Sequence, residues 1–195
     1  MVVDGFLSRM EIFALRWRAA LCYRRSRVGD RTSHGQVNRH RTSSSALLPD
    51  RDSTTLRSIR SKVARLACCA PEQIEQLQIT RYRVGEYYRP HHDALTPSMV
   101  SSLKEQSRGG QRIATVLVYL NSLAPEDTGG QTFFPGADIS IRPRAGRAVL
   151  WNNCDAALNP LAEAVHEACA PTVGVKYVLS CFIRERPIAR YRARR

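Results

Sequence analysis

Residues 82–93 read YRVGEYYRPHHD and contain the most informative motif of the chain, His91-x-Asp93. In an extended strand, side chains two residues apart point to the same side. The His91 imidazole and the Asp93 carboxylate would therefore converge, whereas His92 would point away. The strand supplies two ligands for a metal ion, and a third must come from another part of the chain. Taken alone, the motif also fits a simple surface pair.

The third ligand is predicted to be His166. Of the five histidines, His34 and His40 fall within residues 24–45, which are rich in Arg, Ser and Gly and are predicted to form an exposed loop or irregular strand. His166 lies far downstream and is followed by apolar, β-rich sequence. Two histidines and one carboxylate with open coordination positions form the facial triad of non-haem iron(II) oxygenases.

The composition predicts one globular domain with a basic surface. The chain has 195 residues, of which 43% are hydrophobic and 24% charged, which is ordinary for a domain that buries a core. The net charge of +13 is unusual and favours anionic partners such as nucleic acid or membrane surfaces. A solvated basic surface with a basic tail over residues 188–195 is the alternative, and we favour it.

The six cysteines include no CxxC pair, so they are predicted to be mostly buried free thiols in a reducing compartment. No apolar run reaches the 18 residues that suggest a membrane span. The start, MVVDGFLSRMEIFALRWR, lacks the apolar region of a signal peptide. A cytoplasmic location is expected by default, with the endoplasmic reticulum as the alternative if the N-terminus is truncated.

Periodicity predicts two helices followed by many short strands. Apolar residues repeat at helical spacing over about 8–23 and again over 54–70, where Pro71 would end the second helix. Further along the chain, the polar segment 94–111 follows the His91-x-Asp93 strand. It is predicted to be a mobile loop beside the metal, suited to act as a lid. Strands separated by turns indicate a β-sandwich or barrel-like core. The predicted strands are 77–84, 88–93, 112–121, 131–134, 139–141, 147–151 and 175–183.

Several ordered motifs resemble the catalytic domain of prolyl 4-hydroxylases, within the 2-oxoglutarate- and Fe(II)-dependent dioxygenases. The resemblance covers about residues 2–187 and implies a mainly β fold with flanking N-terminal helices (α+β), a double-stranded β-helix or jelly roll, with its core over 77–187. The motifs are Tyr82, Gly85, Tyr88, Pro90, His91 and Asp93, then Arg112–Asn121, Gly129–Pro135, and finally His166, Gly174 and Lys176.

The resemblance implies that His91, Asp93 and His166 hold Fe(II). It also implies that Lys176 binds the far carboxylate of 2-oxoglutarate, with hydroxyl groups of Tyr82 and Thr132 completing its hydrogen bonds. The residues agree with this, because a charged lysine in an apolar strand costs several kcal/mol unless it is paired. A lysine that reaches the surface is the alternative.

The implied reaction is hydroxylation of a prolyl residue at its 4-position in a peptide or protein. O2 would be consumed, succinate and CO2 released, and L-ascorbate would restore oxidised iron. Arg112, Tyr88 and Trp151 are candidates for holding a proline-containing peptide, although Trp151 equally suits core packing. The chain departs from the family pattern at Ala170, which separates Cys169 from Pro171, and at Phe182, where tryptophan is common.

Three other functions stay open. The first is a nucleic-acid-directed oxygenase of the same fold, which the basic charge favours. The lysine at position 176 opposes it, because those enzymes typically use arginine for the co-substrate carboxylate. The second is a free amino-acid hydroxylase, and the third is a catalytically silent binding module.

Overall fold

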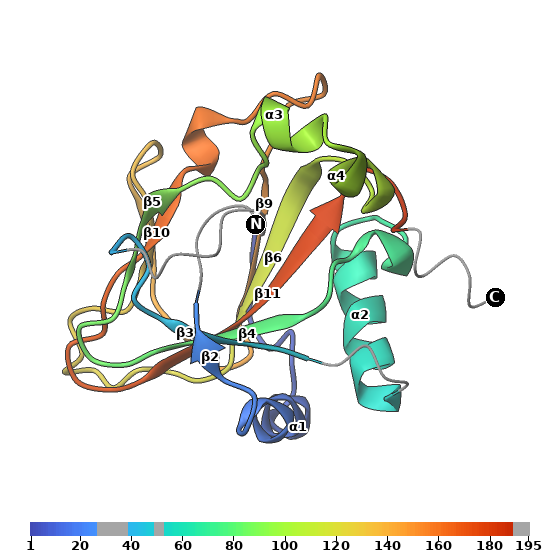
Figure 1. The fold of residues 1–195 in the computed structure, drawn as a ribbon. Coiled ribbons are helices and arrows are strands. Elements are labelled where there is room, and N and C mark those ends of the chain that lie inside the picture. Colours follow the sequence, from blue (N-terminus) through green and yellow to red (C-terminus); the bar gives the residue numbers. More distant parts are fainter. Residues whose placement is uncertain (27–38, 49–52, 189–195) are drawn as a thin grey trace.

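The structure is a computed structural model that describes residues 1–26, 39–48 and 53–188. Two antiparallel sheets make up its core (Figure 1). This arrangement confirms the predicted mainly β class. In spatial order the larger sheet contains β1 (Val2–Val3), β9 (Ala148–Asn152), β6 (Arg112–Tyr119), β11 (Lys176–Arg184), β4 (Gln78–Tyr82), β3 (Ser44–Leu47) and β2 (Arg24–Arg25).

The smaller sheet has four strands and carries the histidines of the predicted metal site. Its spatial order is β5 (Tyr88–His91), β10 (His166–Ala168), β7 (Thr132–Phe134) and β8 (Ile139–Ile141). The helices are α1 (Arg9–Ala19), α2 (Thr54–Leu66), α3 (Pro97–Val100) and α4 (Leu103–Ser107), with 3-10 turns at Pro71–Gln73 and Ala162–Ala164. Every helix of the described residues is too short or too polar to cross a lipid bilayer.

Alternation along the two central strands separates the main core from the site. Successive side chains of a strand point to opposite faces of the sheet. On β6, Val116 and Val118 face the helices and join the main core, whereas Leu117 and Tyr119 face the smaller sheet. Figure 1 shows α1 and α2 on the side of the larger sheet opposite to β5 and β10. The site is thus built on the face that the helices leave uncovered.

The N-terminal helices form where apolar periodicity predicts them, but both are shorter. Ser8 caps α1 in a capping box, since its hydroxyl accepts from the Glu11 amide while the Glu11 carboxylate accepts from the Ser8 amide. The second helix, α2, ends at Leu66, five residues before Pro71. Cys68 then adopts a left-handed conformation with φ of 50° and turns the chain away.

The segment 94–111 differs from its prediction as a mobile loop. It forms the two short helices α3 and α4, and Glu105 of α4 is buried. Gln111 closes the base of the segment, because its side-chain amide accepts from the Leu95 amide at 2.7 Å and donates to the Leu95 carbonyl at 3.0 Å. These hydrogen bonds close the base of the segment, and the 2.8 Å ion pair between Glu105 and Arg184 of β11 holds it against the sheet.

Three smaller predictions also need correction. The strand β5 ends at His91, so Asp93 lies in the bend that follows rather than in the strand itself. All six cysteines are free, but Cys22 and Cys68 are exposed rather than buried. Ile188 is buried and its amide donates to the Glu72 carbonyl, so the packed domain continues past its predicted end at residue 187. The rest of the predicted tail and His34 lie outside the described residues.

Candidate active site

The three predicted metal ligands meet between the two sheets. Strand β10 pairs with β5 in a register that places His166 opposite His91, and Asp93 follows two residues after His91. One nitrogen or oxygen atom from each of the three side chains lies within 4.8 Å of the other two. The Nε2 atoms of His91 and His166 each lie 3.7 Å from a different oxygen of the Asp93 carboxylate. Pairing of remote strands therefore assembles the triad.

Backbone contacts orient both imidazole rings toward the centre. Nδ1 of His91 lies 2.8 Å from the Arg89 carbonyl, and Nδ1 of His166 lies 3.0 Å from the Ala164 carbonyl. A carbonyl only accepts, so each Nδ1 carries the proton and each Nε2 presents a lone pair. Burial lowers the pKa of His91 to about 3, which keeps this ring neutral. The donor set therefore has the protonation that a metal requires.

The Asp93 carboxylate is held by a second layer of polar side chains. The Thr115 hydroxyl donates to Asp93 Oδ2 at 2.8 Å, and the Asn153 amide donates to the Thr115 hydroxyl at 3.0 Å. Both supporting side chains are buried. Burial opposes ionisation of Asp93, but the neighbouring groups, His166 first, lower its pKa overall. The sequence motifs do not include this pair, although Thr115 is a polar residue on the inward side of an apolar strand.

Aromatic rings enclose the two histidines. Tyr88 stacks on His91 with 3.5 Å between ring centroids. Trp151 meets His166 edge-on at 4.7 Å and Phe134 at 5.2 Å. Tyr88, a candidate for holding the peptide, lines the central cavity, whereas Trp151 is not among the lining residues. The position of Trp151 matches the core-packing alternative, in which its ring supports a metal ligand.

Lys176 lies fully buried on the same face of the larger sheet. Its ammonium group is 3.3 Å from the Gln131 carbonyl and 3.4 Å from the Thr132 hydroxyl. No carboxylate among the described residues forms an ion pair with it. Burial therefore lowers the pKa of Lys176 to about 7. An unpaired buried cation is costly in an empty protein and is suited to receive an anionic ligand.

The two predicted hydroxyl groups lie beside Lys176. Tyr82 is its cross-strand partner, and the ammonium group is 5.4 Å from the centre of the Tyr82 ring. Thr132 contacts the ammonium directly and accepts a 2.8 Å hydrogen bond from the Tyr119 hydroxyl. The structure thus brings together every residue that was predicted for the co-substrate, and it adds Tyr119, which strand periodicity alone did not distinguish from core.

One continuous cavity of about 1670 Å³ reaches both groups of residues. It is lined by His91, Asp93 and His166, by Lys176 with Tyr82 and Thr132, and by residues of segment 94–111. A shared cavity allows a single small dianion to touch the metal position at one end and the buried lysine at the other. The sequence predicted the residues of the triad and of the Lys176 group, but it did not predict that one cavity would reach both.

Arg112 lines the cavity, but its guanidinium group is already occupied. It forms two hydrogen bonds with the Glu75 carboxylate, at 2.6 and 2.9 Å, and lies 4.0 Å above the Phe182 ring. Nε of the buried Arg184 approaches the same carboxylate at 2.6 Å, a charge contact rather than a directed hydrogen bond. Arg184 also binds Glu105 of α4 at 2.8 Å. A buried charge network therefore joins the cavity wall to segment 94–111.

Arg41 is a cavity residue that had no predicted role. Its guanidinium group lies 4.7 Å above the Tyr88 ring and donates to the hydroxyls of Ser43, Ser45 and Thr80 at 3.2 Å each. The stack of Arg41, Tyr88 and His91 links the metal position to the polar strands at the sheet edge. Nothing in the local sequence distinguishes this arginine from the many others.

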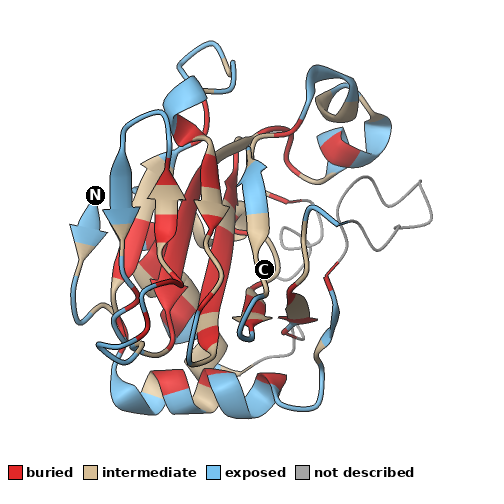
Figure 2. Ribbon diagram, turned by 90° about the vertical axis from the view of Figure 1, so that its left-hand side faces the viewer, coloured by how far each residue is buried: buried red, intermediate tan, exposed pale blue. Residues whose placement is uncertain are grey.

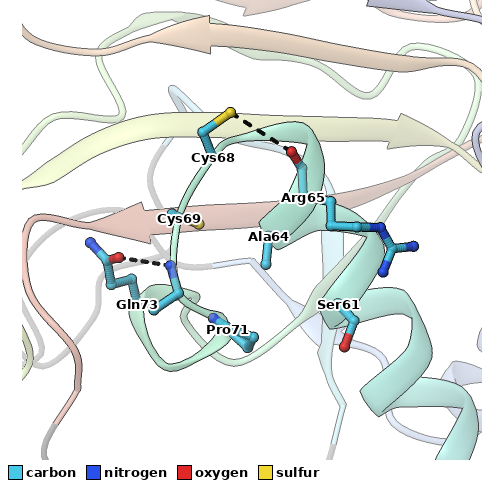
Figure 3. A pocket seen from close by; sticks show the side chains of 8 residues that line it. Ser61, Ala64, Arg65, Cys68, Cys69, Pro71 and Gln73 are labelled. Carbon is cyan, nitrogen blue, oxygen red and sulfur yellow. Dashed lines mark hydrogen bonds between the residues drawn. The ribbon is translucent and has the colours of Figure 1, made fainter.

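A second hollow lies at the C-terminal end of α2, where Cys68 and Cys69 are adjacent (Figure 3). Figure 3 shows the Cys68 sulfur directed at the Arg65 carbonyl, at 3.9 Å. Burial raises the pKa of Cys69 to about 11, so this thiol stays protonated. No group of metal-ligating side chains other than the triad occurs among the described residues. The candidate site is therefore the cavity between the sheets.

The residues present fit iron(II) and a small dicarboxylate. Two imidazole nitrogens and one carboxylate oxygen converge on one point, which matches the facial arrangement that leaves open coordination positions. Lys176 supplies a buried positive charge without a carboxylate partner in the same cavity. His92 is exposed, as predicted, and does not compete for the metal position.

Comparison with known proteins agrees with this geometry. Residues 77–184, more than half of the chain, match the model of the 2OG-Fe(II) oxygenase superfamily. A probable prolyl 4-hydroxylase of Arabidopsis thaliana is 30% identical, with 80% of this chain and 58% of the relative covered. The human prolyl 4-hydroxylase subunit alpha-1 is 33% identical, with 75% and 27% covered. The chain thus spans only part of the length of these relatives.

The fold is shared with solved structures. The 2OG complex of the viral collagen prolyl hydroxylase from Paramecium Bursaria Chlorella virus-1 superimposes with a TM-score of 0.73 at 23% identity, with 94% of each chain covered. This likeness establishes the predicted jelly-roll architecture. Together with the match over residues 77–184, it shows that the chain belongs to the superfamily of 2-oxoglutarate- and iron(II)-dependent oxygenases.

Proposed function

We propose that this chain hydroxylates prolyl residues, at the 4-position, in a peptide or protein. Superfamily membership supports the class of chemistry, and the relatives named as prolyl 4-hydroxylases support the choice of substrate. The single observation that carries the proposal is one cavity, which is lined both by the His91, Asp93 and His166 triad and by Lys176. Lys176 is buried there and forms no ion pair with a carboxylate of the described residues.

Each group of residues has a separate task in this proposal. His91, Asp93 and His166 hold iron(II), and the hydrogen bond from Thr115 keeps the Asp93 carboxylate oriented. Lys176 binds the far carboxylate of 2-oxoglutarate. When bound, iron and 2-oxoglutarate supply the oxidative chemistry, in which one oxygen atom of O2 enters succinate, CO2 is released and the other oxygen atom enters the substrate as a hydroxyl group.

The remaining cavity residues would place the peptide. Tyr88, whose ring stacks on His91, offers an aromatic wall beside the metal position, and proline-rich segments bind well to such walls. Arg112 would act with its charge already balanced by Glu75, so it would orient backbone carbonyls rather than pair with an acidic side chain. Ascorbate, which would restore oxidised iron, is part of the same proposal. The free thiols support a reducing compartment such as the cytoplasm.

The test is succinate formation from 2-oxoglutarate with iron(II) and ascorbate, with and without a proline-rich peptide. Peptide-stimulated turnover and a gain of one oxygen on a prolyl residue, located by mass spectrometry, are expected. The His166→Ala variant should lose this turnover, because two protein ligands rarely hold iron(II), while the exposed His92→Ala variant should keep it.

Other outcomes would separate the competing functions. Turnover that responds to single-stranded DNA or RNA, with salt-dependent binding, would replace the prolyl substrate by nucleic acid. Turnover that responds to free proline would indicate an amino-acid hydroxylase. Bound iron without any succinate under all of these conditions would leave a silent binding module.

A further inference from the structure

Helix α1 carries an apolar stripe that the fold leaves uncovered. Residues three, four and seven apart share one side of a helix. Ile12, Leu15 and Ala19 form the buried side, against the core. The opposite side presents four large apolar side chains to solvent, and in Figure 2 this helix runs along the bottom of the molecule. Their exposed fractions are 76% for Met10, 63% for Phe13, 73% for Trp17 and 97% for Leu21 just beyond the helix.

The stripe is ordered, and arginines flank it. The rings of Phe13 and Trp17 stack with centroids 6.3 Å apart, so the two largest side chains form one surface. From the helical spacing, Arg9 and Arg16 lie along one edge of the stripe and Arg18 along the other. All three arginines are exposed, and none of them forms an ion pair with a carboxylate among the described residues.

Within the described residues, the acidic side chains near α1 are already neutralised. Glu11 binds Lys62 at 2.8 Å, and Asp4 lies between Arg144 and Arg147 at 3.0 and 2.6 Å. The surface around the stripe is therefore basic, in keeping with the net charge of +13. An apolar strip bordered by arginines complements a partner that has an apolar interior beneath a layer of negative charge.

We propose that the stripe of α1 (Met10, Phe13, Trp17 and Leu21) docks the protein on an anionic lipid membrane surface. Interfacial helices bind in this way, with aromatic and aliphatic side chains among the acyl chains and arginines at the headgroups. A second copy of the chain fits less well. Two copies that met through this stripe would bring their bordering arginines together without carboxylates between them, and like charges facing each other oppose such an interface.

The docked orientation would leave the candidate active site accessible. The stripe points away from the larger sheet on the helix-covered side, whereas the cavity opens on the opposite face of that sheet. The membrane would thus hold the enzyme without closing its cavity. This inference is independent of the proposed substrate, because it rests on α1 alone.

The test is flotation of the full chain with vesicles of phosphatidylcholine and with vesicles that contain about one third phosphatidylserine. We expect binding to the anionic vesicles only, and a weakening as salt screens the arginines. Trp17 should shift its fluorescence to shorter wavelength on binding. The Trp17→Phe variant should still bind but lose the shift, because the other tryptophan, Trp151 of β9, packs on the face of the larger sheet opposite to α1.

Variants test the two parts of the surface separately. The double variant Phe13→Ser with Leu21→Ser should reduce vesicle partitioning at least tenfold, whereas Leu103→Ser, a control 90% exposed on α4, should not change it. Replacing Arg9, Arg16 and Arg18 by Gln should reduce partitioning on the order of a hundredfold, since each basic residue contributes about 1 kcal/mol at such a surface. Circular dichroism checks that the variants stay folded.

Three results would overturn the inference. One is absence of binding to anionic vesicles by the folded wild-type chain. Another is equal loss of binding in the Leu103→Ser control, which would show that the stripe is not the contact. The third is concentration-dependent dimerisation that the double variant Phe13→Ser with Leu21→Ser abolishes while vesicle binding is unchanged, which would identify a second copy as the occupant. Succinate formation is not needed for any of these readouts.

Discussion

At the scale of single residues, the most informative side chain is Lys176. It is fully buried, has no carboxylate partner among the described ion pairs, and its pKa falls to about 7 because burial disfavours the charge. Burying this unpaired ammonium group lowers the stability of the ligand-free protein. A bound anion would offset that cost, which is why we propose that Lys176 marks the co-substrate end of the cavity.

The first prediction follows from this cost. Lys176→Met should abolish 2-oxoglutarate binding yet stabilise the empty protein at pH 6 by about 1–3 kcal/mol, because an unpaired buried charge is removed. The folded pKa lies below the unfolded value near 10.4. The unfolded wild-type chain therefore holds more protons between about pH 7 and pH 10, and the wild-type stability should rise with pH in that window.

Urea unfolding at pH 6 and pH 9 measures the effect, and calorimetric titration with manganese(II) as an inactive metal measures co-substrate binding. The wild-type affinity for 2-oxoglutarate should weaken as the pH rises above 7, because the lysine must then gain a proton on binding. Unchanged 2-oxoglutarate binding in Lys176→Met would contradict the role of this residue.

The second prediction concerns the hydrogen bond between Thr115 and Asp93. Thr115→Val keeps the shape but removes the 2.8 Å donor to the carboxylate. Iron(II) affinity should fall about 10- to 100-fold, as is usual when a partner of a metal ligand is lost. Thr115→Ser should restore most of the affinity, and a Val variant that binds iron normally would show that packing alone orients Asp93 without the hydroxyl.

At the scale of elements, charged side chains fix two loops that hydrophobic patterns leave unspecified. Asp127 is buried in the turn before β7 and accepts hydrogen bonds from the amides of Gly129, Thr172 and Gly174. It thereby joins that turn to the segment that leads into β11 and Lys176. Gly129 is required at this crossing, because a Cβ there would lie 2.0 Å from the Ala170 carbonyl oxygen.

The third prediction is that Asp127→Asn destabilises the fold by about 2 kcal/mol, since buried amides lose a charged acceptor. The amide hydrogen bonds outweigh burial and lower the pKa of Asp127. Its contribution is therefore present above the unfolded pKa near 3.9 and is lost as the pH falls through the folded value. Thermal unfolding between pH 3 and pH 7 should show the variant and the wild type converging toward the acid end; a constant gap would contradict the assignment.

The fourth prediction concerns how α4 is held. Glu105→Gln removes the charge that pairs with the buried Arg184 and should cost about 3 kcal/mol, because a buried charge loses one of its partners. Proteolysis should then cut first within residues 94–111. The matched control is Arg108→Gln, which removes a partly exposed partner of the same carboxylate and should cost less than about 1 kcal/mol. Equal protease resistance in Glu105→Gln and wild type would rule out this attachment.

At the scale of the whole molecule, the two sheets of different size have different roles. The larger sheet packs one face on α1 and α2 and presents the other to the cavity, while the smaller sheet supplies two of the three proposed metal ligands. The ligands come from β5, the bend that follows it, and β10, so the metal position lies where the sheets approach. Remote strands must pair before the site exists, and the site is thus a product of the complete fold.

Local periodicity determined much of this protein from the sequence. Alternation and turn residues predicted β4 to β9 and β11 within a few residues but did not predict β2, β3 or β10. The ordered motifs predicted the jelly roll and selected the residues of the triad and Lys176 as candidates. These features depend on neighbours along the chain, or on spacings that the family resemblance preserves. The strands and helices can be predicted from the sequence because side-chain direction repeats every two residues in a strand and every 3.6 residues in a helix.

Only the tertiary structure decided the rest. It turned segment 94–111 into two helices, neutralised Arg112 with Glu75, gave Trp151 a supporting place beside His166, and exposed the second apolar side of α1. The physical reason is that each outcome depends on a partner distant in the chain. Periodicity shows which side of an element is apolar or polar, but the partner that meets that side is fixed only when the sheets and helices pack together.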